Sequence, residues 1–357
     1  MINSEAFKLQ IPDRDFIDRQ ITWYQTSQRD LPWRNTSNPY HVWLSEIMLQ
    51  QTRVKAVIPY FERFLREYPS LEKLAKADEP RVLDLWAGLG YYSRARNLLK
   101  TARLILENHQ GRFPESFDQV ISLPGIGRYT AGAILSIAFK KPLPILDGNI
   151  RRLFLRFLGI ESPVDSILTA RLWKTLELLV DQVPPESISD FNQSLMELGA
   201  LVCTPKNPRC HDCPLQDFCE AFLAGTQDRI PRRKRKKQTE ELSFVCLIFR
   251  SGNLFLMTKS NNQPYLKGFW DFPKLETQPD DPSIQIQFQR AIGLEFDKRT
   301  ELEPIPHQIT FRKMTFHPWI ADLKNHLNET TDLKWIDPDQ PGYPKPAYVK
   351  KILDKLT

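Results

Sequence analysis

The sequence predicts a two-domain protein in which an all-α region is followed by a smaller mixed α/β domain. From Asp15 to about Phe222, apolar residues such as Val54, Val57 and Phe61 recur at the three- and four-residue steps of amphipathic helices. A basic run then interrupts this pattern, and beyond it the chain is rich in β-branched and aromatic residues. A chain of 357 residues is long enough to bury two hydrophobic cores.

Short breakers divide the first region into helix-sized pieces. Proline, glycine and polar pairs are the residues that end helices or form the turns between them. They stand at Pro69-Ser70, Asp78-Glu79-Pro80, Gly88-Leu89-Gly90, Gly111 to Pro114 and Pro124-Gly125. No alternating strand pattern occurs between them, so this region is predicted to be all-α.

The basic run defines a linker between the two regions. Residues 232–237 are all lysine or arginine, and this run alone equals the formal net charge of +6. Acidic and basic residues balance elsewhere, so net charge is weak evidence for a nucleic-acid partner. After the linker, the β-rich runs 242–249 and 253–258 flank Arg250-Ser251-Gly252, a sequence typical of a hairpin turn. A helix is predicted from Tyr348 to Leu356.

The sequence favours a protein of a reducing compartment. The first residues mix charged with apolar side chains, and no later stretch reaches the length of a membrane span. Four of the five cysteines crowd into one short segment, which does not resemble a disulfide framework. We therefore expect an intracellular monomer without a membrane partner, located in the bacterial cytoplasm, or in the nucleus if the source is eukaryotic.

The clustered cysteines predict a metal centre. Cys203, Cys210, Cys213 and Cys219 are separated by six, two and five residues, so four thiolates can converge on one site. Tetrahedral zinc and an iron-sulfur cluster both use four cysteines, and the spacing alone leaves the two open.

A glycine-containing turn between two helical stretches predicts a phosphate-binding hairpin. Leu123-Pro124-Gly125-Ile126-Gly127 leads directly into a helical pattern that begins at Arg128. Gly125 and Gly127 allow the backbone to approach a phosphate, and the following helix presents free N–H groups at its positive end. Such a helix-hairpin-helix grips DNA without reading its sequence.

Asp147 follows the hairpin helix at the start of another helix. The stretch before it contains two prolines and no helical period, which places Asp147 on a loop. An aspartate at this position commonly caps the helix that follows. The same helix end favours the ionised carboxylate, which can face a developing cation.

Together, the hairpin, the later aspartate and the cysteine cluster resemble the endonuclease III superfamily of DNA glycosylases. Residues 42–52, Val-Trp-Leu-Ser-Glu-Ile-Met-Leu-Gln-Gln-Thr, are similar to the signature of the MutY-type adenine glycosylases, and residues 267–273 resemble the MutT-like (Nudix-like) domain of that family. The resemblance is dense over about residues 20–222 and weaker beyond. It implies a catalytic region 1–226, with a six-helix barrel at about 29–136 and an iron-sulfur subdomain from 1–28 and 137–226. A linker 227–241 and a lesion-recognition domain 242–357 would follow.

The resemblance also implies the chemistry. The four cysteines would hold a [4Fe-4S] cluster, Glu46 would protonate the departing adenine, and Asp147 would stabilise the resulting sugar cation. A carboxyl group with an ordinary pKa of about 4.3 is protonated only about one part in 500 at neutral pH. Glu46 therefore needs burial among apolar neighbours to act as an acid.

Further residues take their expected roles from the family pattern. Tyr129 would line the pocket and Asn149 would orient water or the sugar. Trp33, Arg34 and Gln193 would meet the extruded base. Gln51 and Tyr91 would fill the gap that base flipping leaves in the DNA, with Leu89 as a further DNA contact.

Tyr129 also separates two classes of glycosylase. Enzymes of this superfamily that also cut the DNA strand carry a lysine at this place, which forms a Schiff base with the sugar. Tyrosine predicts base release alone. The rival interpretations are a thymine or uracil mismatch glycosylase, and a DNA-binding protein without catalysis whose cluster reports redox state.

The C-terminal domain departs from the family at its lesion-reading loop. Relatives carry His-x-Phe-Ser-His, and the corresponding residues here are His307-Gln308-Ile309-Thr310-Phe311. Thr310 keeps the hydroxyl, whereas Phe311 replaces the second histidine. We therefore expect activity on adenine opposite 8-oxoguanine or guanine, with a smaller preference for 8-oxoguanine than the full loop would give.

Overall fold

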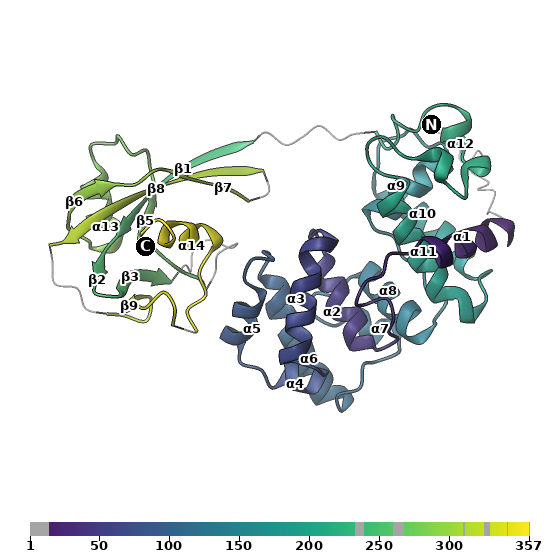
Figure 1. Ribbon diagram of the computed structural model, residues 1–357, viewed down its shortest axis with the longest axis horizontal. Helices are drawn as coiled ribbons and strands as arrows, with labels where there is room; N and C mark the ends of the chain where they lie inside the picture. Colours follow the sequence, from purple (N-terminus) through teal and green to yellow (C-terminus); the bar gives the residue numbers. More distant parts are fainter. Residues whose placement is uncertain are drawn as a thin grey trace. The chain divides into compact units, whose positions relative to one another are not determined.

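The computed structural model describes residues 14–232, 239–259, 268–309, 311–324, 329–340 and 342–356 (Figure 1). Most of the basic run, residues 233–237, and Thr310 lie outside the described residues. Contacts divide the chain into two compact units, Met1–Lys76 with Arg96–Arg235, and Ala77–Ala95 with Lys236–Thr357. The predicted domain boundaries do not separate residues 77–95 in this way. Among the described helices, none is both long and apolar enough to cross a membrane.

Helices alone form the regular structure from Arg14 to Leu223, as predicted. Three short 3₁₀ turns, η1 (Pro185–Ser187), η2 (Cys210–Asp212) and η3 (Gln216–Phe218), supplement them. The helices are α1 (Arg14–Ser27), α2 (Pro39–Leu49), α3 (Val54–Glu67), α4 (Leu71–Ala75), α5 (Glu79–Trp86), α6 (Ser93–His109), α7 (Phe117–Ile121), α8 (Arg128–Phe139), α9 (Gly148–Phe157), α10 (Ser166–Val180), α11 (Ile188–Leu201) and α12 (Glu220–Leu223).

Two of these helices are buried almost all round and pack against each other. In α2, every residue from Val42 to Met48 is buried, and in α8 the same holds from Thr130 to Ile137. A helix that is apolar on all faces belongs inside a core rather than on a surface. Glu46 on α2 is therefore carried into the interior of the first unit, and Tyr129 lies partly buried at the start of α8.

The turn between α7 and α8 has the predicted helix-hairpin-helix form. Gly125 has φ +80°, and a Cβ there would lie 2.9 Å from the Cβ of Asn97, so glycine is required. The Thr101 hydroxyl of α6 stabilises the turn by donating a hydrogen bond to the Pro124 carbonyl at 2.9 Å. A Cβ on Gly127 would have no atom within 4 Å, so the backbone here is open to a close approach.

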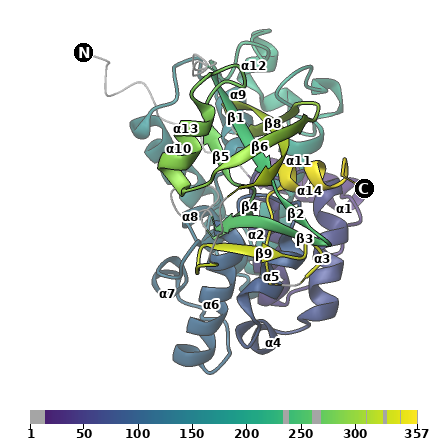
Figure 2. The ribbon, with the colours of Figure 1, turned by 90° about the vertical axis from the view of Figure 1, so that its left-hand side faces the viewer.

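The second unit contains two β-sheets. One has the order β5-β1-β8-β6, with β7 also paired to β8, and the other has the order β2-β3-β4, with β9 paired to β3. The strands are β1 (Glu240–Ile248), β2 (Arg250–Ser251), β3 (Leu254–Lys259), β4 (Trp270–Asp271), β5 (Lys274–Glu276), β6 (Phe296–Glu301), β7 (Ile305–Ile309), β8 (Arg312–Leu323) and β9 (Leu333–Ile336). Strands β1 and β8 run parallel and lie side by side (Figure 2).

Strand β1 is buried on both faces because a helix covers each side. Phe244 and Cys246 share one core cluster with Tyr348 of α14 (Ala347–Leu353). Val245 and its neighbours on the opposite face share another with Phe288 of α13 (Ile284–Ile292). The predicted α/β character of this region is confirmed.

Three details differ from the sequence-based predictions. The turn at Gly252 joins β3 to the two-residue β2, while β1 pairs in the other sheet, because a strand buried on both faces needs a central position. The last helix, α14, ends at Leu353 rather than Leu356. His307 and Gln308 lie within strand β7 rather than in a loop, so the connection to β8 is only residues 310–311.

Candidate active site and cysteine cluster

The first unit contains a pocket of about 450 Å³ that collects most of the predicted catalytic and base-contacting residues. The sequence-predicted residues among its lining are Trp33, Arg34, Glu46, Gln51, Tyr129, Asp147, Asn149 and Gln193. Of the remaining candidates, Gly125 and Gly127 form the hairpin, and Leu89 and Tyr91 belong to the other unit. Residues far apart in sequence thus meet in one cavity, contributed by α2, α8, α11, the N-terminus of α9 and the segment between α1 and α2.

Glu46 is a buried carboxyl group whose pKa is raised. It lies on helix α2, whose residues from Val42 to Met48 are all buried, and Glu46 itself is only 7% exposed. Burial raises the pKa of Glu46 from 4.5 to about 7, against the opposing effects of a hydrogen bond with Tyr129 and the charge of Arg34. The negative charge of Asp147 adds to the rise. At neutral pH a substantial fraction of Glu46 therefore carries the proton that an acid must donate.

Asp147 caps α9, as its position in the sequence predicts. Its Oδ1 accepts hydrogen bonds from the backbone N–H groups of Asn149, at 2.9 Å, and Ile150, at 2.7 Å. Its Oδ2 accepts a third, from the Asn149 side chain at 3.0 Å. These three donors hold the Asp147 carboxyl group at the N-terminus of α9.

Tyr129 is partly buried and lines the same pocket as the two carboxyl groups. Burial raises the pKa of its hydroxyl well above the usual value, and the negative charges of Glu46 and Asp147 raise it further. The hydroxyl therefore keeps its proton at any physiological pH and donates it in the hydrogen bond to Glu46.

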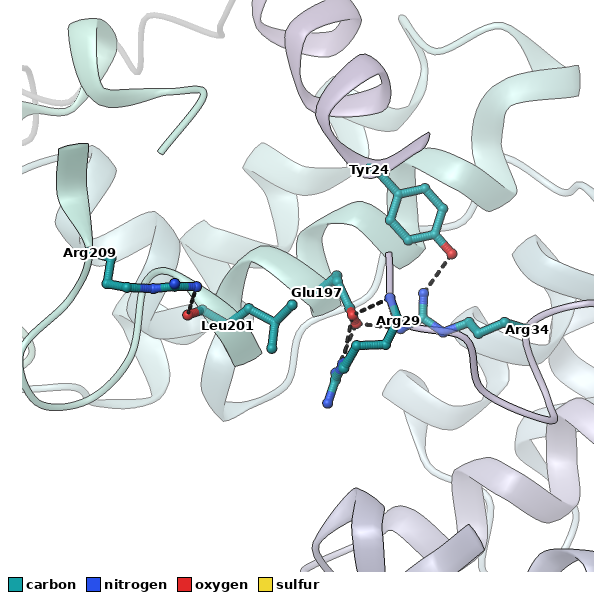
Figure 3. A network of polar contacts seen from close by, with 6 residues as sticks. All are labelled: Tyr24, Arg29, Arg34, Glu197, Leu201 and Arg209. Carbon is teal, nitrogen blue, oxygen red and sulfur yellow. Dashed lines mark hydrogen bonds and ion pairs between the residues drawn. The ribbon is translucent and has the colours of Figure 1, made fainter. Parts of the chain in front are cut away.

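A buried ion-pair network holds Arg34 at the pocket (Figure 3). The Nη2 of Arg34 donates to Oε2 of Glu197 at 2.9 Å, and its Nη1 donates to the Tyr24 hydroxyl at 2.6 Å. Glu197 also accepts from Arg29 Nε at 2.6 Å and Nη2 at 2.8 Å, and from the Arg29 backbone N–H at 3.0 Å. Arg29, Arg34 and Glu197 all line the pocket.

The two predicted wedge residues share an unusual backbone conformation. Gln51 has φ +58° and Tyr91 has φ +48°, values in the left-handed region that residues other than glycine rarely adopt. Such backbone strain is often found at functional sites. The Tyr91 side chain is 44% exposed, whereas Leu89 is buried at 6%. Their contacts with DNA remain predictions.

Hydrogen bonds connect the Asp147 carboxylate to the cysteine cluster. Asn149, which donates to Asp147, accepts from Arg152 Nη2 at 3.0 Å, and the Nε of Arg152 donates to the Cys203 carbonyl at 2.8 Å. Arg156 contacts the same cysteine, with its Nη1 3.3 Å from Sγ. Helix α9 thus carries both the cap of the active site and the arginines that hold the first cysteine.

The four cysteines fit an iron-sulfur cluster by their shared surroundings. Cys203, Cys210, Cys213 and Cys219 are all free thiols and line a single pocket together with apolar residues. Burial raises the pKa of Cys213 to about 12, so a thiolate there requires a nearby positive charge such as that of iron. In the part of the chain that the structure describes, no three cysteine, histidine or carboxylate side chains are arranged to hold one metal ion. The fit rests on the shared pocket and its apolar walls.

Sequence reasoning missed Glu197, Arg29 and Arg152. Glu197 carries a signal of the same kind as Glu46, because it is an acid within the apolar stretch Leu195 to Leu201. Its partners, however, are 163 and 168 residues away in sequence, and no local pattern indicates such pairs.

Known proteins match the chain along most of its length. Residues 44–178 match the HhH-GPD superfamily of base excision DNA repair proteins, residues 203–219 the iron-sulfur binding domain of endonuclease III, and residues 244–355 the NUDIX domain. Adenine DNA glycosylase of Buchnera aphidicola from Schizaphis graminum is 36% identical, over 94% of this chain and 96% of that protein. The mouse adenine DNA glycosylase is also 36% identical, over 86% of this chain and 70% of its own length.

Solved structures agree with the helical part of the fold. A thermostable thymine-DNA glycosylase superimposes with a TM-score of 0.53 at 29% identity, covering 58% of this chain and 95% of that one. The predicted [4Fe-4S] cluster is confirmed by the iron-sulfur domain match and the four free cysteines within it. The chain thus matches the helix-hairpin-helix, iron-sulfur and Nudix domains, and it is 36% identical to an adenine DNA glycosylase over 94% of its length. It therefore belongs to the MutY-type adenine DNA glycosylases of base excision repair.

Proposed function

We propose that this enzyme removes adenine that is mispaired with 8-oxoguanine or guanine, using Glu46 as the acid and Asp147 as the stabilising carboxylate. The observation that carries the proposal is a single pocket holding a buried carboxyl group with a pKa of about 7 beside a carboxylate that caps a helix. Two carboxyl groups in such different surroundings suit the two different tasks of acid and anion.

The proposed reaction begins with an adenine turned out of the duplex into the pocket. Glu46 transfers its proton to a ring nitrogen of the base, and the bonding electrons of the N-glycosidic bond leave with the neutral adenine. The sugar becomes cationic as that bond breaks, and the Asp147 carboxylate stabilises it until water adds to the same carbon and gives up a proton, which restores the acid form of Glu46. Asn149, which donates to Asp147, keeps this carboxylate in place.

The pocket supports base release without strand cutting. Strand cutting through a Schiff base needs an amine near the sugar, and Tyr129 stands where related enzymes carry lysine. None of the described residues that line the pocket is a lysine. The base opposite the adenine is proposed to be read by the Nudix-like domain, as the sequence resemblance implies.

The test is the substitution Glu46→Gln, which keeps the size of the side chain and removes its acidic proton. Single-turnover adenine release at pH 7 should fall by roughly 100-fold or more, while binding to the mispaired duplex is retained. The matched control is Glu62→Gln, at an exposed position on α3, which should leave the rate unchanged. Duplexes with thymine opposite guanine, run in parallel, test the rival mismatch activity.

The pH dependence of the single-turnover rate is a second test of Glu46 as the acid. Glu46 acts only when protonated, so the wild-type rate should fall as the pH rises through about 7. Rapid adenine release by Glu46→Gln, or a rate that does not decline across this range, contradicts the proposed acid.

A further inference from the structure

Glu197 is a fully buried carboxylate within the pocket wall, and the proposed mechanism does not use it. Its side chain has no exposed surface, and it lies on α11 facing the segment between α1 and α2 (Figure 3). Burial alone would raise the pKa of Glu197, but hydrogen bonds from Arg29 and the charge of Arg34 outweigh that effect and lower it. Glu197 is therefore an anion at neutral pH, surrounded by two cations.

The arginines need this anion because the segment that carries them is irregular. Arg29 and Arg34 lie between α1 and α2, where no helix or strand fixes the backbone. Glu197 accepts from the Arg29 backbone at 3.0 Å, which anchors the start of the segment to α11. Arg34 is then held between Glu197 and the Tyr24 hydroxyl, and its side chain is only 7% exposed.

Arg34 lines the same pocket as Glu46 and Glu197, and its charge acts on the carboxyl group of Glu46. The groups that act on Glu46 are the Tyr129 hydroxyl on α8, the positive charge of Arg34 and the negative charge of Asp147 at the start of α9. Arg34 opposes protonation of Glu46, whereas Glu197 is not among the main influences on it. A free arginine cation at this place would favour loss of the proton that catalysis needs.

We infer that Glu197 is a positioning residue for adenine release, which orients Arg34 toward the extruded base and offsets its charge so that Glu46 keeps its proton. The inference rests on the proposed role of Glu46. Glu197 itself touches neither the base nor the reacting bond in this scheme, and it acts only through Arg34.

The test is the single-turnover rate of adenine release as a function of pH for Glu197→Gln. The amide keeps the shape and loses the charge, so Arg29 and Arg34 both lose this counter-charge, and Arg34 is the one of the two that acts on Glu46. The pH at which the rate falls by half should move down by roughly half a unit to one unit, which lowers the rate at pH 8 by about three- to tenfold. The rate at pH 5.5 should change less. A merely structural role predicts an equal loss at every pH and no shift of the midpoint.

Companion variants separate charge from anchoring. Tyr24→Phe removes the other hydrogen bond to Arg34 but keeps the Glu197 charge, so it should lower the rate without moving the midpoint.

Arg34→Met removes the cation and should move the midpoint upward. In the Arg34→Met background, adding Glu197→Gln should give no further shift, because the two residues act as one unit. Asp15→Asn, which breaks an exposed pair with Arg19, is the matched control and should change neither rate nor midpoint.

The outcomes distinguish this inference from the proposed function. A folded Glu197→Gln protein with an unmoved midpoint overturns the inference and leaves Glu46 as the acid. If Glu197→Gln does not fold, an Arg34→Met midpoint that fails to rise overturns it instead. A wild-type rate that does not fall through about pH 7 contradicts the acid itself.

Discussion

The raised pKa of Glu46 makes the stability of the folded chain depend on pH, an effect at the scale of the single residue. This pKa is raised from 4.5 to about 7 in the folded protein, so between these values the folded chain holds a proton that the unfolded chain has lost. Stability therefore falls as the pH rises through this window. The shift corresponds to about 3 kcal/mol, which is present in full below the lower value and lost above the upper one.

Glu46→Gln should accordingly unfold at a higher temperature than the wild type at pH 8. At pH 4 the two proteins should be nearly equal, because both then bury a neutral side chain. The measurement is thermal unfolding followed by circular dichroism across this pH range, with Glu62→Gln as the control at an exposed site. A difference that does not grow with pH would mean that the folded protein does not bury the charge of Glu46.

At this scale, the sequence position of Asp147 correctly predicted that it caps the following helix. Glu46 was indicated by the family resemblance, and the structure adds that it is buried on α2. The Glu197 network was not identifiable, since it joins Arg29 to a residue 168 positions away. Partners of that kind are set by the packing of α1 against α11, which only the folded chain reveals.

At the scale of elements, the position of Asp147 depends on how closely α8 approaches the segment before α9. Gly132 lies on α8 at this contact, and a Cβ there would be 2.3 Å from the Pro144 carbonyl oxygen. That atom is backbone and cannot rotate away. The glycine thus lets Pro144 and Ile145 approach α8 closely, just before Asp147, which lines the same pocket as Tyr129.

Gly132→Ala should both destabilise the protein and slow adenine release. The methyl group must push the segment away, which typically costs about 1 to 3 kcal/mol in a well-packed core, and the displacement should carry Asp147 out of place. Thermal unfolding and single-turnover rates measure the two effects. Gly148→Ala is the control for stability, since a Cβ there meets no atom within 4 Å. Equal unfolding temperatures for the two variants would show that the contact with Pro144 is not tight.

Elements differ in how far the sequence predicts them. The helices follow a local period of apolar residues, so α8 and α9 lie where the pattern places them. Strand pairing is not local, and β1 was therefore expected beside β3, although it pairs with β8. Nothing in the turn at Gly252 indicates that β1 is buried on both faces, because that depends on α13 and α14.

At the scale of the whole molecule, the proposed function assigns the two bases of the mispair to two different units. The proposed adenine pocket belongs to the helical unit, and the proposed reader of the opposite base lies in the Nudix-like domain. Under this proposal, a preference for 8-oxoguanine requires both units. The chain departs from the family pattern at Phe311, in the short connection between β7 and β8.

Phe311→His should increase the preference for adenine opposite 8-oxoguanine over adenine opposite guanine. The Phe311 carbonyl accepts a hydrogen bond from the Glu240 backbone N–H at 3.1 Å. A change of side chain leaves this backbone bond intact, so the histidine should keep the backbone position of Phe311. The guanidinium of Arg312 lies 5.0 Å from the centre of the Phe311 ring. One added hydrogen bond to the lesion is worth roughly 0.5 to 1.5 kcal/mol, which corresponds to an increase of up to about tenfold in the ratio of the two rates. Single-turnover release on the two duplexes gives this ratio, and Phe311→Leu, which adds no donor, should leave it unchanged. If the histidine variant behaves like the leucine variant, the opposite base is read elsewhere in the chain.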